Sequence, residues 1–462
     1  MSFGSGRFTT DSAAEGLVAY LRTSPSPFHA VASSLSVLVE AGFTPLDERD
    51  AWPSEPGRYV TTRGGSLVAW STERVLTRPF DGSGGGADDG DAGGERGAVA
   101  FRVVGAHTDS PNLRIKPRPD HERVGWQLLG VEPYGGLLLN SWLDRDLGLS
   151  GRVAVRESDG SVGERLFAVD EPLLRVSQLA IHLDRSTNDA LTLNKQLHME
   201  PSWALSQAPL FVEWLAEQVR VEPVDVLSWD AMTHDVQPAA RTGLHREFVA
   251  GARMDNLATS YAATQALIDA VERPAPEGEV PLVPLVPLIA LFDHEEIGSM
   301  SERGAFSNLL PTIFERIIST LGGGRDDVHR AMAHTVIASG DMAHATHPNY
   351  ADRHEPAHHI AMNGGPVLKI NTNLRYATDS VGAAHFAAAC REAGVPMQEF
   401  VVRSDLPCGS TVGPMTAALT GATTVDFGAP TLSMHSAREL VGAADQAMYG
   451  AALAAFLAPG RD

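Results

Sequence analysis

The chain contains only two cysteines, Cys390 and Cys408, among its 462 residues. Two cysteines supply neither a disulfide framework nor a zinc site built from thiolates. Basic residues are also scarce, because 36 Lys and Arg stand against 57 Asp and Glu, a formal net charge of −21. No basic stretch is available to release counterions from a nucleic acid, so we expect no nucleic-acid partner. A local positive site for an acidic small substrate remains compatible with this charge.

Long apolar runs are missing as well. The run from Pro281 to Leu291 is too short for a transmembrane helix and is interrupted by proline. Residues 1–7 lack the charged and apolar regions of a signal peptide. We therefore expect a cytoplasmic protein that has no membrane partner.

Length and composition indicate a globular protein of more than one domain. A chain of 462 residues exceeds a single small core. Its 43% hydrophobic and 20% charged residues are ordinary for such proteins. A low-complexity insert at 81–94 is rich in Gly and Asp. We expect this insert to be a disordered surface loop, because its spacing does not match a calcium loop.

The pattern of expected elements divides the chain. Helical periodicity at 12–22 and 28–41, with Ser12 and Ser26 near the first turns, alternates with short apolar strands. From about residue 113 the pattern changes to short alternating runs typical of antiparallel strands. We therefore predict a three-layer α/β domain interrupted by an inserted, mostly β domain. The predicted α/β domain comprises residues 1–112 and 248–462, and the inserted domain residues 113–247.

One stretch combines an expected buried strand with a run of ionisable residues. Residues 287–292 are apolar, and Asp293, His294, Glu295 and Glu296 follow directly. In α/β proteins, ligands bind at the carboxyl ends of such strands. Adjacent carboxylates are costly there unless positive charge lies beside them. A metal ion would supply that charge, with one glutamate coordinating it and the other handling a proton. A solvated turn is the alternative for this stretch taken alone.

Four other stretches place ionisable side chains where an expected strand gives way to a loop. The first ends in His107 and Asp109, which lie on one side because alternate strand residues share a face. A carboxylate near a metal-binding histidine commonly holds its ring. Asp255 precedes an expected helix at 257–271, where a helix N-cap is the alternative role. The last two stretches supply Asp341 with His344, and His435.

Other histidines carry weaker signals. His347, His354, His358 and His359 follow the Asp341 stretch, and we interpret most of them as loop residues. His182 lies in the inserted region, in a setting where a histidine is more often structural than functional.

The candidate ligands form a consistent donor set of two imidazoles and three carboxylates, without a thiolate. Such a set suits zinc, manganese or cobalt, with one carboxylate bridging two ions. Paired metal ions are a recurring device of hydrolytic enzymes. The set consists of His107, Asp255, Glu296, Asp341 and His435.

Five motifs also carry a resemblance to a known family. They are Gly-Ala-His-Thr-Asp-Ser-Pro at 105–111, Arg-Met-Asp-Asn at 253–256, Asp-His-Glu-Glu-Ile-Gly at 293–298, Ser-Gly-Asp-Met-Ala-His-Ala at 339–345 and Met-His-Ser at 434–436. Together they resemble the aspartyl aminopeptidase family of dinuclear zinc metallopeptidases. The resemblance runs along nearly the whole chain in the family's order, apart from the insert at 81–94.

The resemblance implies a role for each candidate. Asp255 would bridge two metal ions, and Glu295 would be the general base. Asp109 would orient His107. The other ligands divide between the two ions, with His107 and Asp341 on one and Glu296 and His435 on the other.

The resemblance also implies a substrate, an assembly and a fold. Peptides with an N-terminal Asp or Glu would bind through His344, Lys369 and Tyr376, and His182 would reach the site of a neighbouring subunit. The fold would be a zinc-peptidase α/β domain with a dimerisation domain, assembled from dimers into a dodecamer. Two alternatives stay open: a neutral, leucine-like specificity at the same metal site, and an inactive assembly or binding protein.

Overall fold

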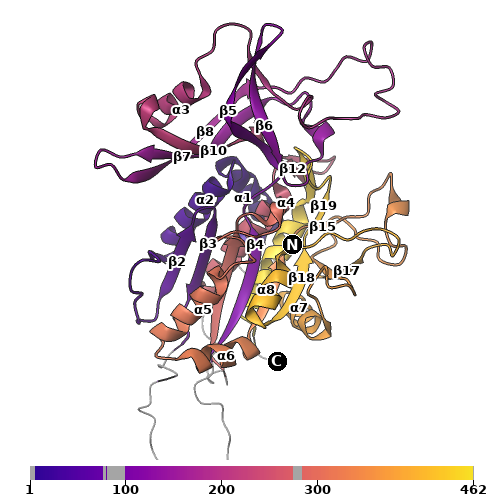
Figure 1. The fold of residues 1–462 in the computed structure, drawn as a ribbon. Coiled ribbons are helices and arrows are strands. Elements are labelled where there is room, and N and C mark those ends of the chain that lie inside the picture. Colours follow the sequence, from indigo (N-terminus) through magenta and orange to yellow (C-terminus); the bar gives the residue numbers. More distant parts are fainter. Residues whose placement is uncertain (1–5, 76–79, 81–98, 274–282, 461–462) are drawn as a thin grey trace, which may run out of the picture.

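The computed structural model describes residues 6–75, 80, 99–273 and 283–460, and shows a large lobe below a smaller one (Figure 1). The insert at 81–94 lies outside the described residues. The mixed α/β architecture expected from the sequence is confirmed.

A nine-stranded sheet of described residues forms the centre of the large lobe. Its four middle strands, β13, β4, β14 and β18, are parallel to one another, so their carboxyl ends meet at one edge. In sheet order the strands are β1 (Thr44–Pro45), β2 (Arg58–Arg63), β3 (Ser66–Ser71), β13 (Leu285–Phe292), β4 (Ala100–His107), β14 (Val336–Gly340), β18 (Thr423–Gly428), β16 (Val367–Ile370) and β17 (Gln398–Val401).

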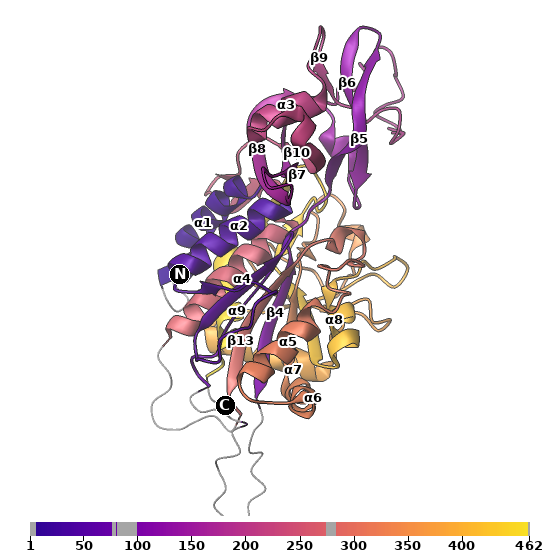
Figure 2. The same ribbon diagram turned by 60° about the vertical axis from the view of Figure 1, so that its left-hand side comes forward.

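Helices cover both faces of this sheet, because alternate strand residues feed two separate cores. Val104 and Ala106 of β4 belong to one core, and Phe101 and Val103 belong to the other. The result is the expected three-layer arrangement (Figure 2). The first core is covered by α1 (Thr10–Thr23), α2 (Pro27–Glu40), α4 (Met254–Glu272), α7 (Ser380–Ala393) and α9 (Ala443–Leu457), and the second by α5 (Leu309–Thr320), α6 (Arg325–His334) and α8 (Val412–Thr420).

The first two helices show how local sequence sets their limits. Ser26 caps α2 by accepting a hydrogen bond from the backbone N–H of His29, and Pro27 takes the first helical position, as the sequence predicts. The cap of α1 is Thr9, with Ser12 one turn inside and donating its backbone N–H to Thr9.

A six-stranded antiparallel sheet forms the smaller lobe. One helix, α3 (Phe211–Val219), packs on it and contributes Phe211 and Leu215 to a core of its own. This matches the mostly β character expected for the inserted region, whose limits at 113 and 247 remain a prediction. The strands are β8 (Val162–Leu174), β7 (Leu147–Arg156), β10 (Val226–Asp235), β5 (Asn112–Arg123), β6 (Trp126–Tyr134) and β9 (Ser202–Ala204).

A third sheet lies near the junction of the lobes and corrects one expectation. The alanine-rich segment 438–456 reads as one helix, but residues 439–442 form strand β20, and α9 begins only at Ala443. Pairing of β20 with strands on both sides overrides the local helical preference. The sheet contains β11 (Ala240–Thr242), β12 (Phe248–Gly251), β20 (Glu439–Gly442), β19 (Pro430–Leu432) and β15 (Ala343–His344).

One smaller difference from what the local sequence suggests has a local cause. The glycine-rich sequence at 408–414 is typical of a turn, but the chain passes into α8 at Val412, because Thr411 accepts a hydrogen bond from the backbone N–H of Gly413 and caps the helix. None of the helices in the described part of the chain has the length and apolar character needed to cross a membrane.

Candidate metal centre and active site

The carboxyl ends of three neighbouring parallel strands bring ionisable side chains together. His107 is the last residue of β4, and Asp341 follows β14 directly. Glu295 and Glu296 lie in a short 3-10 helix, η4 (Glu295–Ile297), just after β13. Because these strands are adjacent and parallel, residues far apart in sequence meet at one edge of the sheet.

Both histidines of the site keep one ring nitrogen free for a ligand. His107 Nδ1 lies 3.0 Å from the backbone carbonyl oxygen of Asp109. His435 Nδ1 lies 3.1 Å from the carbonyl oxygen of Gly136. A carbonyl only accepts, so each bond requires a proton on Nδ1 and leaves Nε2 as the electron-pair donor. Each ring is thus held in the tautomer that a metal ion requires.

Asp255 lies between the two histidines. Its Oδ1 is 3.3 Å from Nε2 of His107, and its Oδ2 is 3.5 Å from Nε2 of His435. Asp255 does not take the alternative role of a helix N-cap: Arg253 occupies the cap position of α4, and Asp255 has non-helical backbone angles inside the first turn. The carboxylate faces the histidines instead of the helix backbone.

The other two candidate ligands, Asp341 and Glu296, each lie beside one of the two histidines. Asp341 Oδ1 lies 3.6 Å from Nε2 of His107, and Glu296 Oε2 lies 3.4 Å from Nε2 of His435. Three sets of residues place their ligand atoms within 4.8 Å of one another: His107 with Asp255 and Asp341, Asp255 with Glu296 and His435, and His107 with Glu295 and Glu296. The first two sets share Asp255 and match the division expected from the sequence.

Unpaired carboxylate oxygens show that these residues fit a metal ion. Oδ1 of Asp255, Oε1 of Glu296 and Oδ1 of Asp341 are buried and accept no hydrogen bond from the described residues. A buried polar atom without a partner is costly. Two carboxylates about 4 Å apart also repel each other by roughly 4 kcal/mol at an effective dielectric constant near 20. Divalent cations offset both penalties, and the nitrogen and oxygen donors suit zinc.

The pKa values in the cluster show that the charge of each group depends on the charges of its neighbours. Burial lowers the pKa of His435, but Asp255 and Glu296 outweigh burial and raise it to about 10. Burial acts to raise the pKa of Asp255, yet His107 and His435 bring it well below the usual range. Burial and the charge of Asp255 raise the pKa of Glu296. Each group thus depends on opposite charge from its neighbours, a role that metal ions take over when they replace protons.

Glu295 lies beside the cluster. Its Oε2 is 3.9 Å from Nε2 of His107, and its backbone N–H donates to Oδ1 of Asp109 over 3.1 Å. Burial, followed by the neighbouring carboxylates, raises its pKa to about 8 against the opposing effect of His107. A carboxyl group tuned toward neutral pH can both accept and return a proton.

Lys369 and Tyr376 line the Asp341 side of the cluster. The buried ammonium of Lys369 lies 3.2 Å from Oδ2 of Asp341 and 5.2 Å from the centre of the Tyr376 ring. Desolvation and the charge of Lys369 lower the pKa of His344, while Asp255 and Asp341 act in the opposite direction. The structure therefore brings these three predicted substrate residues close enough to the candidate metal ligands to interact with them.

Comparison with known proteins decides the family. The family model described as "Aminopeptidase I zinc metalloprotease (M18)" matches residues 20–82 and 92–457. The chain belongs to the M18 family of zinc metallo-aminopeptidases. The match leaves out residues 83–91, inside the insert that the sequence motifs did not place.

One curated relative and two solved structures match this chain over most of their own length. The "Probable M18 family aminopeptidase 2" of Mycobacterium tuberculosis H37Rv is 49% identical over 449 residues, which cover 96% of this chain and 98% of the relative. Ape4, solved in complex with Nbr1, matches with a TM-score of 0.88 and 35% identity over 99% of this chain and 88% of Ape4. The mApe1 dodecamer of S. cerevisiae matches with a TM-score of 0.79 and 26% identity over 96% of this chain and 95% of mApe1.

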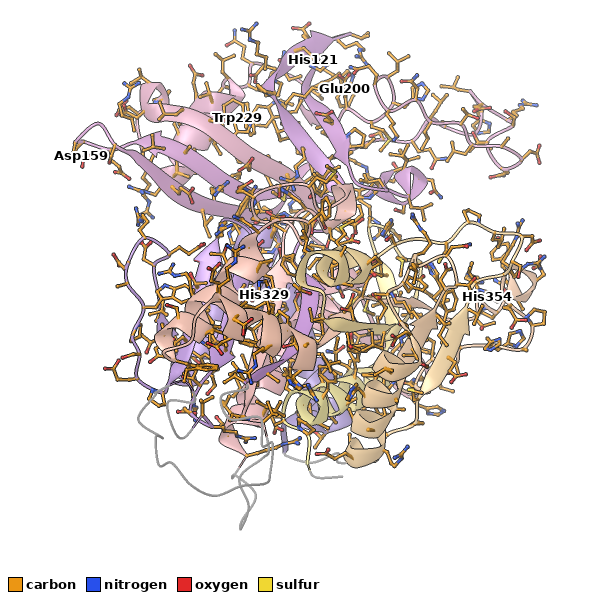
Figure 3. All side chains as sticks on the ribbon, turned by 60° about the horizontal axis from the view of Figure 1, so that its bottom comes forward. His121, Asp159, Glu200, Trp229, His329 and His354 are labelled. Atoms are coloured by element: carbon orange, nitrogen blue, oxygen red, sulfur yellow. The ribbon has the colours of Figure 1, made fainter. Side chains whose placement is uncertain are left out.

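His182 and the histidines of the 347–359 region lie outside this candidate metal centre. His182 lies on an exposed stretch between β8 and β9. His354 lies at the periphery of the molecule (Figure 3), and its Nε2 accepts a hydrogen bond from the backbone N–H of His347. His358 bonds Glu355 within the same loop. None of these residues enters a possible metal-binding group among the described residues, which agrees with the loop interpretation.

One buried carboxylate of the site had no recognisable signal in the sequence. Glu439 accepts the backbone N–H of Asp255 on Oε2 over 3.1 Å and that of His435 on Oε1 over 2.8 Å. It therefore ties together the two segments that carry these ligands. In the sequence it falls in an apparently helical stretch, and only the pairing of β20 reveals its position. Two residues here also have left-handed backbone angles that the sequence does not indicate. One is His435 itself, and the other is Arg253, which lies two residues before Asp255.

Proposed function

We propose that this M18 enzyme removes an N-terminal Asp or Glu from peptides by means of two zinc ions. The observation that carries the proposal is the position of Asp255, whose two carboxylate oxygens face two different histidines. His107 and Asp341 would hold one ion with Asp255, and Glu296 and His435 the other. Manganese or cobalt would also suit these donors.

The residues of the chain divide the chemical work. Bound zinc supplies Lewis acidity, which lowers the pKa of water and polarises a carbonyl. Glu295 takes the proton of the attacking water and returns it to the leaving amine. Asp109 keeps His107 oriented, because its carbonyl and carboxylate oxygens lie 3.0 and 3.4 Å from Nδ1 of that ring.

The preference for an acidic first residue rests on Lys369. Its ammonium is the positive group beside Asp341, in a protein whose net charge is −21. His344 and Tyr376 would line the same pocket. The ion pair between Lys369 and Asp341 also favours a second candidate, because a lysine already neutralised by a carboxylate leaves the pocket suited to a leucine-like residue. The specificity therefore needs a direct test.

The test is hydrolysis of aspartyl, glutamyl and leucyl peptides by the purified enzyme before and after chelation. We expect chelation to abolish turnover, zinc to restore it, and the acidic peptides to have the larger kcat/KM. Dominant leucyl turnover would establish the neutral alternative. Folded protein that neither binds a transition metal nor hydrolyses any of the peptides would support the inactive assembly protein.

Replacing Lys369 by methionine tests the acidic pocket. Loss of the ammonium removes a charge-assisted contact to the substrate carboxylate, so we expect the aspartyl-to-leucyl ratio of kcat/KM to fall about tenfold or more. The leucyl peptide serves as the internal reference for any effect on Asp341. Lys116→Met, at a half-buried lysine of β5 whose ammonium donates to Oε1 of Gln196, is the matched control. An unchanged ratio would remove Lys369 from substrate recognition.

We extend the proposal to the assembly. The likeness to the mApe1 dodecamer supports a homo-dodecamer built from dimers, with the region 113–247 as the dimerisation domain. His182 on its exposed stretch would then reach a neighbouring subunit's site. Native mass spectrometry should give twelve times the mass of the 49.2 kDa chain; a monomer would contradict this.

The cytoplasmic location of the protein stays a prediction, to be checked by cell fractionation.

A further inference from the structure

A short segment after the sheet of the smaller lobe contacts both halves of the proposed metal centre, the half that contains His107 and the half that contains His435. This link, residues 134–141, comprises the last residue of β6, the loop that follows it and most of the 3-10 helix η2 (Leu139–Trp142). Tyr134 donates its hydroxyl to Oδ2 of Asp109 over 2.7 Å. At the other half, the carbonyl oxygen of Gly136 accepts from Nδ1 of His435.

Further contacts fasten the link to the segment that carries His435. The backbone N–H of Leu138 donates to the carbonyl oxygen of His435 over 3.1 Å. The backbone N–H of Ala437 donates to Oγ of Ser141 over 2.8 Å. The backbone of this candidate ligand segment is therefore bonded at His435 and again two residues later by one short stretch of the smaller lobe.

At two positions of the link, a side chain would press closely against a candidate ligand. A Cβ on Gly135 would lie 3.1 Å from Cβ of Glu296, and a Cβ on Gly136 would lie 3.0 Å from Nδ1 of His435. Gly135 also has a φ of +73°, which disfavours other residues. The two glycines thus let the backbone of the link lie directly against two proposed ligands.

Tyr134 acts on the half of the site that contains His107, through the carboxylate of Asp109. The carboxylate of Asp109 accepts the backbone N–H groups of Glu295 and Glu296 and lies next to Nδ1 of His107. The guanidinium carbon of Arg114 lies 4.1 Å from the centre of the Tyr134 ring and fixes its orientation.

From these contacts we infer that residues 134–141 position the metal centre of their own chain, with Tyr134 and Gly136 as positioning residues. The hydroxyl of Tyr134 holds the carboxylate that orients His107, and the carbonyl of Gly136 selects the tautomer of His435. The smaller lobe therefore sets metal affinity within its own subunit, in addition to any role in assembly. The inference rests on the proposed metal centre at these residues.

Two substitutions in the full chain separate the two halves. Tyr134→Phe removes one hydroxyl and keeps the ring over which Arg114 stacks. We expect it to raise the dissociation constant for zinc about tenfold, the lower end of the usual effect of outer-sphere partners, and to lower kcat more than it changes KM. Gly136→Ala pushes the His435 ring, so we expect it to reduce bound zinc from two ions to one per chain.

The measurement is a zinc titration of chelator-treated protein against a chromophoric chelator, together with thermal unfolding of the zinc-free protein. Tyr59→Phe removes a hydroxyl bonded to the carbonyl of Glu55 far from the site, and is the matched control for the tyrosine. Gly130→Ala, on β6 with its nearest contacts at 3.5 Å, is the control for the glycine. The controls should bind two zinc ions with unchanged affinity.

The inference is overturned if wild-type protein binds zinc and turns over substrate, while Tyr134→Phe matches Tyr59→Phe in zinc affinity, kcat and unfolding temperature. An unfolding temperature that falls without any change in zinc affinity would also overturn it, because the link would then serve only stability. Should Gly136→Ala fail to fold, Tyr134→Phe decides alone. Wild-type protein that binds no zinc would instead refute the proposed function.

Discussion

Replacing Glu295 by glutamine is expected to lower kcat by about 10²- to 10⁴-fold while zinc content and assembly stay unchanged. The amide keeps the size of the side chain but accepts no proton, so the barrier rises by roughly 3 to 5 kcal/mol. Glu295 touches His107 only at 3.9 Å, so its loss should leave the ligands in place. Steady-state kinetics combined with metal analysis checks the prediction.

A matched control for this variant lies in the following loop. Glu302 is exposed and pairs only with the neighbouring Arg303 through its side chain, so Glu302→Gln should retain wild-type kcat. Near-normal turnover of Glu295→Gln would remove Glu295 as the base. Loss of zinc from that variant would instead identify Glu295 as a ligand, in agreement with the third possible group, His107 with Glu295 and Glu296.

Replacing Asp255 by asparagine is expected to remove both zinc ions and to lower kcat/KM by roughly 10³-fold or more, about 4 kcal/mol. An amide has one oxygen, whereas the two oxygens of Asp255 face His107 and His435 separately. The nitrogen of the amide would point a donor at one ion, and the charge that both ions share would be lost. Metal analysis after desalting, and kinetics at a fixed zinc concentration, measure the two effects.

The control for this variant is another buried aspartate. Asp445 accepts the backbone N–H groups of Asn363 and Gly365 and belongs to none of the possible metal groups of the described residues. Asp445→Asn should therefore lower stability but keep two zinc ions per folded chain. If Asp255→Asn also kept both ions, Asp255 would not be the shared ligand, and the dinuclear arrangement would be wrong.

Most of the residues of the candidate site could be predicted from the sequence, because they lie at the ends of recognisable strands. His107, Asp341 and the pair Glu295 and Glu296 each come directly after an apolar strand. Parallel strands align their carboxyl ends, so these residues converge wherever the strands become neighbours. The mostly β character of the middle region was predictable for a similar reason, since period-2 alternation is a local signal.

Other features were hidden because they depend on contacts between distant segments. The strand at 439–442 reads as helix, and only its pairing with β12 and β19 gives the backbone a different partner. Glu439 and Gly136 act through backbone N–H and carbonyl groups, which have the same chemistry at every position and so leave no residue signature. The hydroxyl of Tyr134 reaches Asp109 across 25 positions of the chain, a contact that no local pattern indicates.

The sequence by itself determined the candidate donor atoms: two imidazoles and three carboxylates at strand ends, with a glutamate beside them and no thiolate in the candidate set. Only the tertiary structure decided that the oxygens of Asp255 face two different histidines, and that a link from the smaller lobe holds one of those rings. The physical reason is the distance along the chain over which each kind of information acts. Periodicity and residue type are properties of neighbours along the chain, whereas ligand geometry is set by segments that meet only when both lobes are packed.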